Sequence, residues 1–482
     1  MQLNSAGFFL FFAAIFALYW LVPHRVRNPL LFLASLGFYC SFGGGYVFLL
    51  LACITVTFFG GRYLARHRTK AVVRTAVAAA LAPLLLLKYF NFLALSFAGV
   101  FSVLALPFTP VLLALAQPVG ISYYTFQMVS YLVDVYRGDT PPEENFCVCG
   151  LFLSFFPQII QGPMTRPRLL APQYHTERTF SYDRAIASAQ SILLGIFEKK
   201  VVADNLAYYT AAVFKDAQQL HGGSLLLIAF FYTVQIYADF AGYTNMARGF
   251  AGLLGIELAE NFKTPYLARS VKEFWNRWHI SLSAWLRDYL YIPLGGNRTS
   301  TPRYLLNLFV TFLCSGLWHG ASVMMLLWGA LHGFYMVFGT LTKPLRDRMF
   351  ARLHWKRESF SARVFSTAIT FCLVGYAWIF FGAPTPAQGF YIASHLFYDF
   401  VPTLSYCKES IVLLGLSAEA FLRQMSLIGG LFALDLVCYE RSFPEFLSGL
   451  PRGGRLAVCY LLTLLIILFG SVGASDFMYF KF

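Results

Sequence analysis

Long apolar stretches, separated by short polar loops, follow one another along most of this chain of 482 residues. They cover residues 7–22, 29–42, 46–64, 71–87, 92–116, 118–135, 185–214, 224–256, 305–318, 322–341, 364–382, 426–439 and 456–473. Because a helix needs about 20 such residues to span a bilayer, the pattern predicts an all-α transmembrane bundle. We expect roughly 11 crossings, with one or two re-entrant or interfacial helices where a stretch is short. No linker or repeat interrupts the pattern, so residues 1–482 are expected to form a single membrane domain.

The charges are few and strongly basic. Charged residues make up 12% of the chain, and the formal net charge is +14. Soluble domains carry about twice that share of charge. A basic excess can indicate nucleic-acid binding, but no motif of that kind is present, and Lys and Arg lie in short loops between apolar stretches. The positive-inside rule accounts for such loops, so we expect the lipid bilayer as partner and no nucleic acid.

The basic loops predict the orientation of the chain. Residues 62–74 carry five basic residues and residues 343–363 carry seven, so both loops are expected in the cytoplasm. Arg25 and Arg27 follow the first apolar stretch, which argues against a cleavable signal peptide and predicts an outer N-terminus. One apolar stretch follows the basic loop at residues 441–455, so the C-terminal tail is expected on the outer face.

A segment rich in polar residues, 261–298, predicts an amphipathic helix. Ser270 and Glu273 have the spacing of a capping box at a helix start. At about 100° per residue, the apolar side chains that follow share an arc about 120° wide; they are Val271, Phe274, Trp275, Trp278, Leu282, Trp285, Leu286 and Tyr289. His279 falls at the edge of this stripe. It is either a solvated residue of an interfacial helix or a functional group facing a water-filled cavity.

The next apolar segment, residues 304–334, has no formal charge and contains His319 and His332. Basic residues flank it on both sides, which predicts a hairpin with Gly316 and Gly320 near its tip. An ionisable group inside a membrane is costly and points to function. His319 can therefore act as a general base or form a hydrogen bond between helices. For His332 we expect the packing role.

Three other polar side chains stand out. Asp134 and Asp239 lie within apolar stretches, where transporters use carboxylates as ion relays. Tyr479 lies in an aromatic tail, where it belongs either to an interfacial belt or to a site that holds an acyl group on its hydroxyl. The nine cysteines lack the spacing of a zinc site, so no metal is expected.

Five segments resemble the membrane-bound O-acyltransferase family, in the bacterial branch that serves O-acetylation of alginate and other exported polysaccharides. They are PVGISYYTFQMVSYLVDVYRG, SFFPQIIQGPMTRP, QIYADFAGYTNMARG, NFKTPYLARSVKEFWNRWHISLSAWLRDYLYIPLGGNR and SGLWHGA, in this order within residues 118–333. The resemblance implies that His319, in the WHG motif, is the principal catalytic residue. It implies that His279 is the second active-site residue. The tail matches F-x-Y-F-x-F, which implies Tyr479 as a candidate acyl acceptor.

The resemblance also implies the reaction and its partners. The donor would be acyl-CoA, in particular acetyl-CoA entering from the cytoplasm as a substrate, with no tightly bound cofactor. The acyl group would pass His319 through a tunnel in the helical bundle. A periplasmic or extracellular SGNH-type acetyltransferase would complete the transfer to a polysaccharide such as alginate or peptidoglycan. The chain would lie in the bacterial inner membrane. An ion-coupled transporter and a structural scaffold of an exopolysaccharide secretion complex stay open as alternatives.

Overall fold

The computed structural model of the chain describes residues 1–114, 116–214, 217–220, 222–471 and 477–478. Every regular element in these residues is a helix, and no β-strand occurs among them, which confirms the predicted all-α class. The described residues divide into two compact units. The first unit holds residues 1–192 and 246–259, and the second holds residues 193–245 and 260–478.

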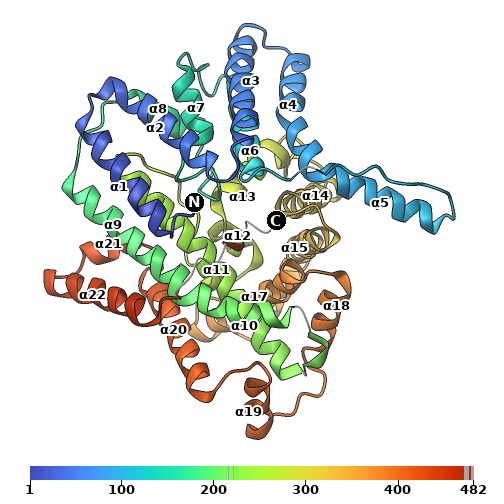
Figure 1. The fold of residues 1–482 in the computed structure, drawn as a ribbon. Helices are drawn as coiled ribbons and strands as arrows, with labels where there is room; N and C mark the ends of the chain where they lie inside the picture. Colours follow the sequence, from blue (N-terminus) through green and yellow to red (C-terminus); the bar gives the residue numbers. More distant parts are fainter. Residues whose placement is uncertain (115, 215–216, 221, 472–476, 479–482) are drawn as a thin grey trace. The chain divides into compact units, whose positions relative to one another are not determined.

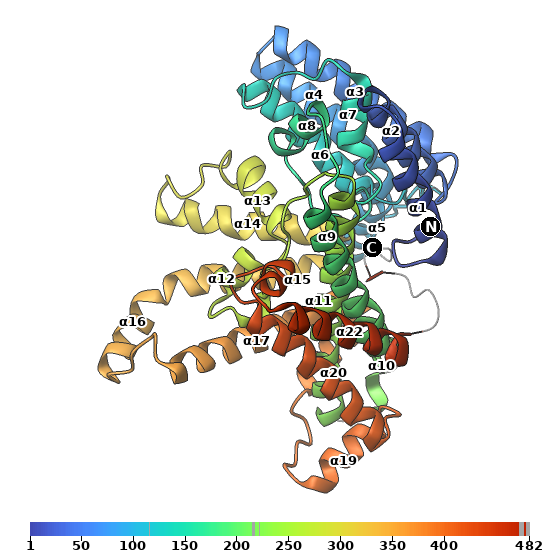
Figure 2. The ribbon, with the colours of Figure 1, turned by 90° about the vertical axis from the view of Figure 1, so that its left-hand side faces the viewer.

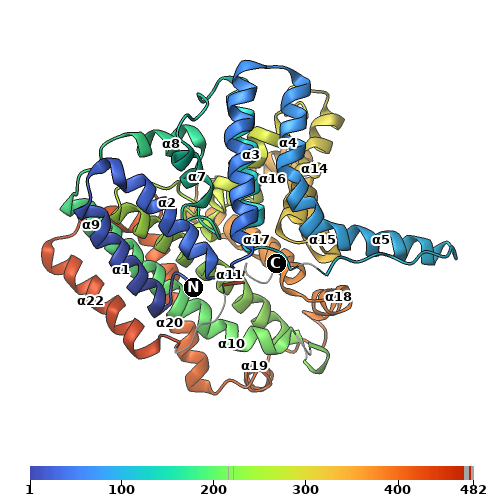
Figure 3. The same ribbon diagram turned by 45° about the horizontal axis from the view of Figure 1, so that its top comes forward.

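The first unit contains the N-terminal helices. They are α1 (Ala6–Leu21), α2 (His24–Cys40), α3 (Tyr46–Arg66), α4 (Lys70–Leu84), α5 (Phe90–Val103), α6 (Ile121–Arg137), α7 (Phe146–Ser154), α8 (Pro167–His175) and most of α9 (Tyr182–Ile196). A π-helical turn, η1 (Leu85–Tyr89), joins α4 to α5. α3 and α4 run antiparallel (Figure 3), and α6 packs against both of them. A cluster of aromatic rings around Phe8, which include Phe12, Phe38 and Phe250, fills part of the core.

The second unit contains the helices that follow. They are η2 (Phe197–Ala203), α10 (Asp204–Val213), η3 (Ala217–Gln219), most of α11 (Gly222–Leu253), η4 (Pro265–Leu267), α12 (Val271–Arg277), α13 (Ile280–Leu286), η5 (Arg287–Tyr291), α14 (Thr301–His319), α15 (Val323–Leu341), α16 (Lys343–Arg352), α17 (Phe360–Gly382), α18 (Pro386–His395), α19 (Leu404–Val412), α20 (Ala418–Val437), α21 (Phe443–Ser448) and α22 (Arg452–Phe469). Here α14 and α15 lie side by side as a hairpin (Figure 1). α16 and the start of α17 extend away from α15 (Figure 2).

Seven helical segments of the described chain are long and apolar enough to cross a bilayer. They are Tyr46–Arg66, Lys70–Val103, Gly222–Leu253, Val323–Leu341, Phe360–Gly382, Ala418–Val437 and Arg452–Phe469. Large apolar side chains lie on their outer faces, and Phe48 and Ile467 are each 73% exposed. Such faces need lipid as their solvent. The chain is therefore a multi-pass membrane protein, while the count of roughly 11 crossings, the tunnel and the single domain remain predictions.

Candidate active site

His319 lies at the end of a regular helical hairpin. It is the last residue of α14, and the chain turns at Gly320 before α15 begins, so the predicted hairpin is confirmed. Gly316 lies where the two helices meet. A Cβ added there would come within 2.1 Å of the Met325 carbonyl oxygen and 3.2 Å of the Cα of Gly329. The absence of a side chain at Gly316 therefore allows a close backbone contact between α14 and α15 near the end of the helix that carries His319.

His279 lies at a break between two short helices. The sequence predicted one amphipathic helix through this region, and that prediction is wrong, because α12 ends at Arg277 and α13 begins at Ile280. Between them His279 takes the left-handed conformation, with φ of 42° and ψ of 52°. The predicted helix start at Ser270 is confirmed, since the Ser270 hydroxyl accepts a hydrogen bond from the Glu273 N–H at the beginning of α12. Glu273 itself accepts from the N–H of Arg269, so the reciprocal half of a capping box is not formed.

Two backbone hydrogen bonds to an earlier loop of the chain stabilise the break between α12 and α13. The N–H of Ile280 donates to the carbonyl of Asn261 at 3.0 Å, and the N–H of Lys263 donates to the carbonyl of Arg277 at 2.9 Å. These two bonds satisfy groups that a continuous helix would have paired internally. His279 is fully buried. The helical pattern placed it at the edge of the apolar stripe, and the solvated position that was one interpretation of that edge is not what the structure shows.

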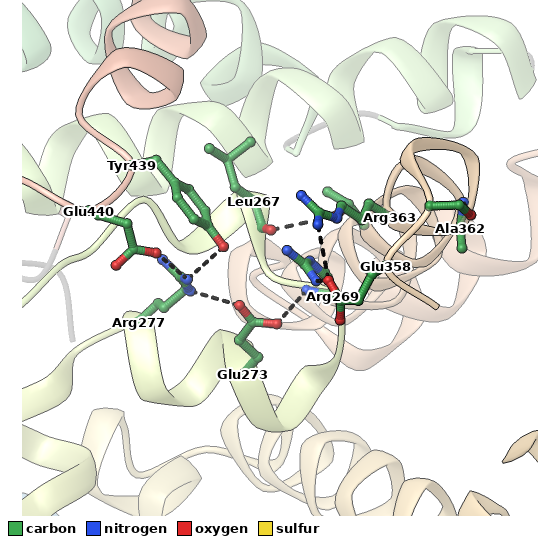
Figure 4. A network of polar contacts seen from close by, with 11 residues as sticks. Leu267, Arg269, Glu273, Arg277, Glu358, Ala362, Arg363, Tyr439 and Glu440 are labelled. Atoms are coloured by element: carbon green, nitrogen blue, oxygen red, sulfur yellow. Dashed lines mark hydrogen bonds and ion pairs between the residues drawn. The ribbon is translucent and has the colours of Figure 1, made fainter. Parts of the chain in front are cut away.

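Side chains around the break form the polar network of Figure 4. Arg277 donates to Glu273 at 3.0 Å and to the hydroxyl of Tyr439 at 2.8 Å, and its guanidinium lies 4.5 Å from the centroid of the Tyr439 ring. Arg269 donates to Glu358 at 3.0 Å. The network thus ties both ends of α12 to two loops of the same unit, the loop between α16 and α17 and the loop between α20 and α21. These contacts fix the position of α12, and His279 follows its last turn.

Asn261 holds the ring of His279. Its Oδ1 accepts from the N–H of Ser281 at 3.3 Å and from the Ser281 hydroxyl at 2.8 Å, and it lies 3.1 Å from Nδ1 of His279. An oxygen that accepts all three contacts requires the proton of His279 on Nδ1, which leaves a lone pair on Nε2. Burial lowers the pKa of His279 to about 3, so the ring is neutral near pH 7. Its Nε2 is buried and has no hydrogen-bond partner within the described residues.

The structure brings His279 and His319 together, and we call them the histidine pair. Their ring centroids are 6.4 Å apart, and both rings contact the indole of Trp318, at 5.9 Å from His279 and 4.9 Å from His319. Phe240 covers His279 at 4.7 Å. Trp328 and Phe381 cover His319 at 5.1 and 5.4 Å. His319 is only 3% exposed, so both imidazoles lie in an apolar, aromatic environment. Such an environment suits a neutral base that removes a proton from a bound hydroxyl.

His332 has the packing role that the sequence predicted. Its Nδ1 accepts a hydrogen bond of 3.2 Å from the indole N–H of Trp275, which joins α15 to α12. Its ring also lies 4.9 Å from the ring of Trp328. His332 therefore supports the aromatic wall behind the histidine pair.

The two carboxylates proposed as ion relays lie in different units. Asp134 is buried in α6 of the first unit, and its carbonyl accepts the N–H of Gly138, where α6 ends. Asp239, in α11 of the second unit, forms a buried ion pair with Lys199 at 2.7 Å.

The sequence pattern did not identify Lys199 and Asn261. Lys199 stands inside an apolar stretch, so the rule that flagged Asp239 could have found it too. Tyr479 lies outside the described residues.

The fold and this site together define a multi-pass helical membrane enzyme with paired imidazoles in an aromatic enclosure. The chain belongs to the membrane-bound O-acyltransferase family, whose model matches residues 149–381. A probable alginate O-acetylase, AlgI, of Pseudomonas syringae pv. tomato is 38% identical over 79% of this chain and 72% of its own length. A peptidoglycan O-acetyltransferase of Helicobacter pylori is 30% identical over 78% of this chain and 75% of its own. A teichoic acid D-alanyltransferase of Bacillus subtilis is 28% identical over 55% of this chain and 69% of its own. The predicted family and enzyme class are thus confirmed.

Proposed function

We propose that the chain moves an acetyl group from cytoplasmic acetyl-CoA across the membrane for O-acetylation of an exported polysaccharide, such as alginate or peptidoglycan. The observation that carries this proposal is the histidine pair, with ring centroids 6.4 Å apart in a buried aromatic enclosure. The relatives named as O-acetylating enzymes match 79% and 78% of the chain, against 55% for the D-alanyltransferase, which favours acetyl as the group transferred.

In the proposed reaction His319 is the general base. Its imidazole accepts the proton of an attacking hydroxyl while the hydroxyl oxygen forms a C–O bond with the thioester carbonyl carbon. The C–S bond then breaks, and the departing CoA thiolate receives that proton. The hydroxyl has a single proton, which goes to His319, so the Nε2 lone pair of His279 accepts a hydrogen bond from another N–H or O–H donor of the bound substrates and so orients them. The attacking hydroxyl belongs to Tyr479, to a serine of the SGNH-type partner, or to a bound acceptor.

The proposed direction of transfer follows from the charge pattern. Basic loops at residues 62–74 and 343–363 would face the cytoplasm, where acetyl-CoA is present. Both termini would lie on the outer face, where a partner acetyltransferase and the polysaccharide would meet the tail. If Tyr479 is acetylated, its ester C–O bond breaks as the acetyl carbon bonds to the next hydroxyl, and the tyrosine hydroxyl is regained. Acetyl would thus cross the membrane without release of free acetate.

Purified protein given radiolabelled acetyl-CoA tests the proposal. We expect release of CoA, and an acyl adduct detected by intact-mass analysis that disappears in Tyr479→Phe. An adduct that persists in that variant would return Tyr479 to the role of an interfacial aromatic. If the wild type never consumes acetyl-CoA, even with its partner, the acyltransfer proposal fails. Loss of ion-driven uptake in Asp134 or Asp239 variants would then support the transporter, and no effect on uptake would support the scaffold.

A further inference from the structure

Three charged side chains form a buried cluster in the second unit, apart from the histidine pair. Nζ of Lys199, in η2, lies 2.8 Å from Oδ1 of Asp204 and 2.7 Å from Oδ1 of Asp239. The side chains are 1%, 1% and 3% exposed. Gly242 in α11 allows this close approach, since a Cβ there would lie 2.8 Å from the carbonyl oxygen of Gly195 and 3.0 Å from the N–H nitrogen of Lys199.

The C-terminal tail binds this cluster. The backbone N–H of Met478 donates to Oδ2 of Asp239 at 2.9 Å, so the two oxygens of that carboxylate serve Lys199 and the tail separately. The ammonium of Lys199 lies 4.3 Å from the ring centroid of Phe477. The same ring meets Tyr243 edge to face at 5.0 Å. Phe477 is fully buried and Met478 is 8% exposed.

The buried carboxylate of Asp239 explains why the cluster would bind a peptide. Lys200 also lies 3.6 Å from Oδ2 of Asp204, so two ammonium groups and two carboxylates balance in charge. A buried carboxylate still needs hydrogen-bond donors for its remaining lone pairs. The Met478 amide supplies one donor. The aromatic ring of Phe477 adds a cation–π contact to Lys199, which strengthens when water is excluded.

Helix α11 carries both a residue of the cluster and a residue of the enclosure around the histidine pair. Asp239, which holds the tail, precedes Phe240, whose ring covers His279 at 4.7 Å. Tyr479 follows Met478 by one residue in the sequence. The chain before the tail is also attached to η2, because the N–H of Ser471 donates to the carbonyl of Lys200 at 3.0 Å.

We propose that Lys199, Asp204, Asp239 and Tyr243 form a binding site for the C-terminal segment of this chain, which we call the tail socket. The tail socket holds Phe477 and Met478 and thereby sets which residue of the tail reaches the histidine pair. Its residues are positioning residues, since they act through the tail. The assignment rests on the proposed function only for its consequence in acyl transfer. Binding of the tail is a separate property with its own measurement.

Hydrogen exchange of the C-terminal peptide in the full chain measures binding directly. We expect slow exchange in the wild type, and much faster exchange of the residues after 477 in Phe477→Ala. Met478→Pro removes the N–H that donates to Asp239, and Met478→Leu is the comparison that keeps this N–H and a similar apolar volume. Exchange in Met478→Leu should be slower than in Met478→Pro, and the chemically inactive His319→Ala should retain slow exchange. Fast exchange in the wild type, or unchanged protection in Phe477→Ala, would overturn the tail socket.

Labelling with acetyl-CoA then tests the consequence. Because hydrogen bonds to charged groups are strong, Met478→Pro should lower acyl labelling of Tyr479 about tenfold or more relative to Met478→Leu. If labelling is equal in the two variants, the tail socket does not position Tyr479. If the wild type shows slow exchange but never consumes acetyl-CoA, the proposed function fails and the tail socket survives as a binding site. The two failures are therefore distinguishable.

Discussion

The two histidines of the pair are carried by very different pieces of structure. His319 ends a regular helix, and the α14–α15 hairpin that holds it is made by contacts between neighbouring helices. His279 interrupts a helix in a left-handed conformation, which costs about 1–2 kcal/mol for a residue other than glycine. Its position depends on Asn261, which lies 18 residues earlier in the chain.

The position of His319 is determined by contacts between neighbouring helices, whereas the position of His279 is determined by contacts with a distant part of the chain. A regular hairpin can be read from apolar periodicity and from a turn, whereas a strained break persists only where other parts of the fold impose it. Strain of this kind is common at functional sites. We therefore expect changes at His319 to act mainly on chemistry and to leave the backbone of the hairpin in place. Changes around His279 should act on chemistry and on local structure together.

The largest effect is expected at His319. His319→Ala removes the proposed base and should lower kcat by about 10²- to 10⁴-fold, measured as CoA release from acetyl-CoA. His332→Gln, which keeps an acceptor for the indole N–H of Trp275, is the matched control and should stay near wild type. Full turnover in His319→Ala, with an unchanged melting temperature, would show that another group acts as the base.

His279→Asn should lower kcat less, by about 10²-fold, because it removes a lone pair that orients the bound substrates but leaves the base. Asn tolerates the left-handed conformation, so the melting temperature should change little. His279→Ala should lose the same activity and also melt earlier, because alanine is strained at this position. Equal melting temperatures for the two variants would contradict the strain that distinguishes His279 from His319.

Gly316→Ala tests the hairpin. The new Cβ would meet the carbonyl oxygen of Met325 at 2.1 Å, so the helices must separate. Overpacking of this kind costs about 1–3 kcal/mol, to be measured as a lower thermal midpoint in detergent. Gly339→Ala is the control, because a Cβ at Gly339 meets nothing within 4 Å in the described structure. A normal midpoint for Gly316→Ala would mean that the hairpin can repack.

Asn261→Asp tests the electrostatics of the break. The pKa of His279 is lowered to about 3 by burial, so this ring stays neutral through pH 5–8. A carboxylate beside Nδ1 stabilises the imidazolium and should raise that pKa by about 1–3 pH units. The ring is then protonated as the pH falls, so the acid limb of kcat/KM moves upward. Asn276→Asp, on the exposed side of α12, is the charge-matched control. An unmoved limb would exclude His279 from the reaction.

The smallest effect is expected in the network of Figure 4. Tyr439→Phe removes the hydroxyl that accepts from Arg277 at 2.8 Å and keeps the ring beneath the guanidinium. The loss should be about 0.5–1.5 kcal/mol of stability, as for one hydrogen bond, with kcat nearly unchanged. A fall in kcat as large as that of His279→Asn would mean that the network controls the chemistry as well as the fold.

The sequence by itself determined the class of the fold and the hairpin that carries His319. Apolar stretches that need lipid predicted the all-α membrane fold, and the charge-free segment around His319 predicted its hairpin, because both depend on contacts between near neighbours. Five motifs within residues 118–333 identified the family. The number of crossings, the orientation and the role of Tyr479 stay predictions.

Only the tertiary structure decided the break at His279 and the pairing of Lys199 with Asp239 across 40 residues. The apolar stripe of residues 271–289 favours one continuous helix, and nothing within the stripe opposes it. The helix ends where Ile280 and Arg277 form backbone hydrogen bonds with Asn261 and Lys263. These two partners lie in an earlier segment, outside the residues of the stripe. Contacts of this range form only once the chain has folded, so periodicity alone could not predict that His279 is buried beside His319.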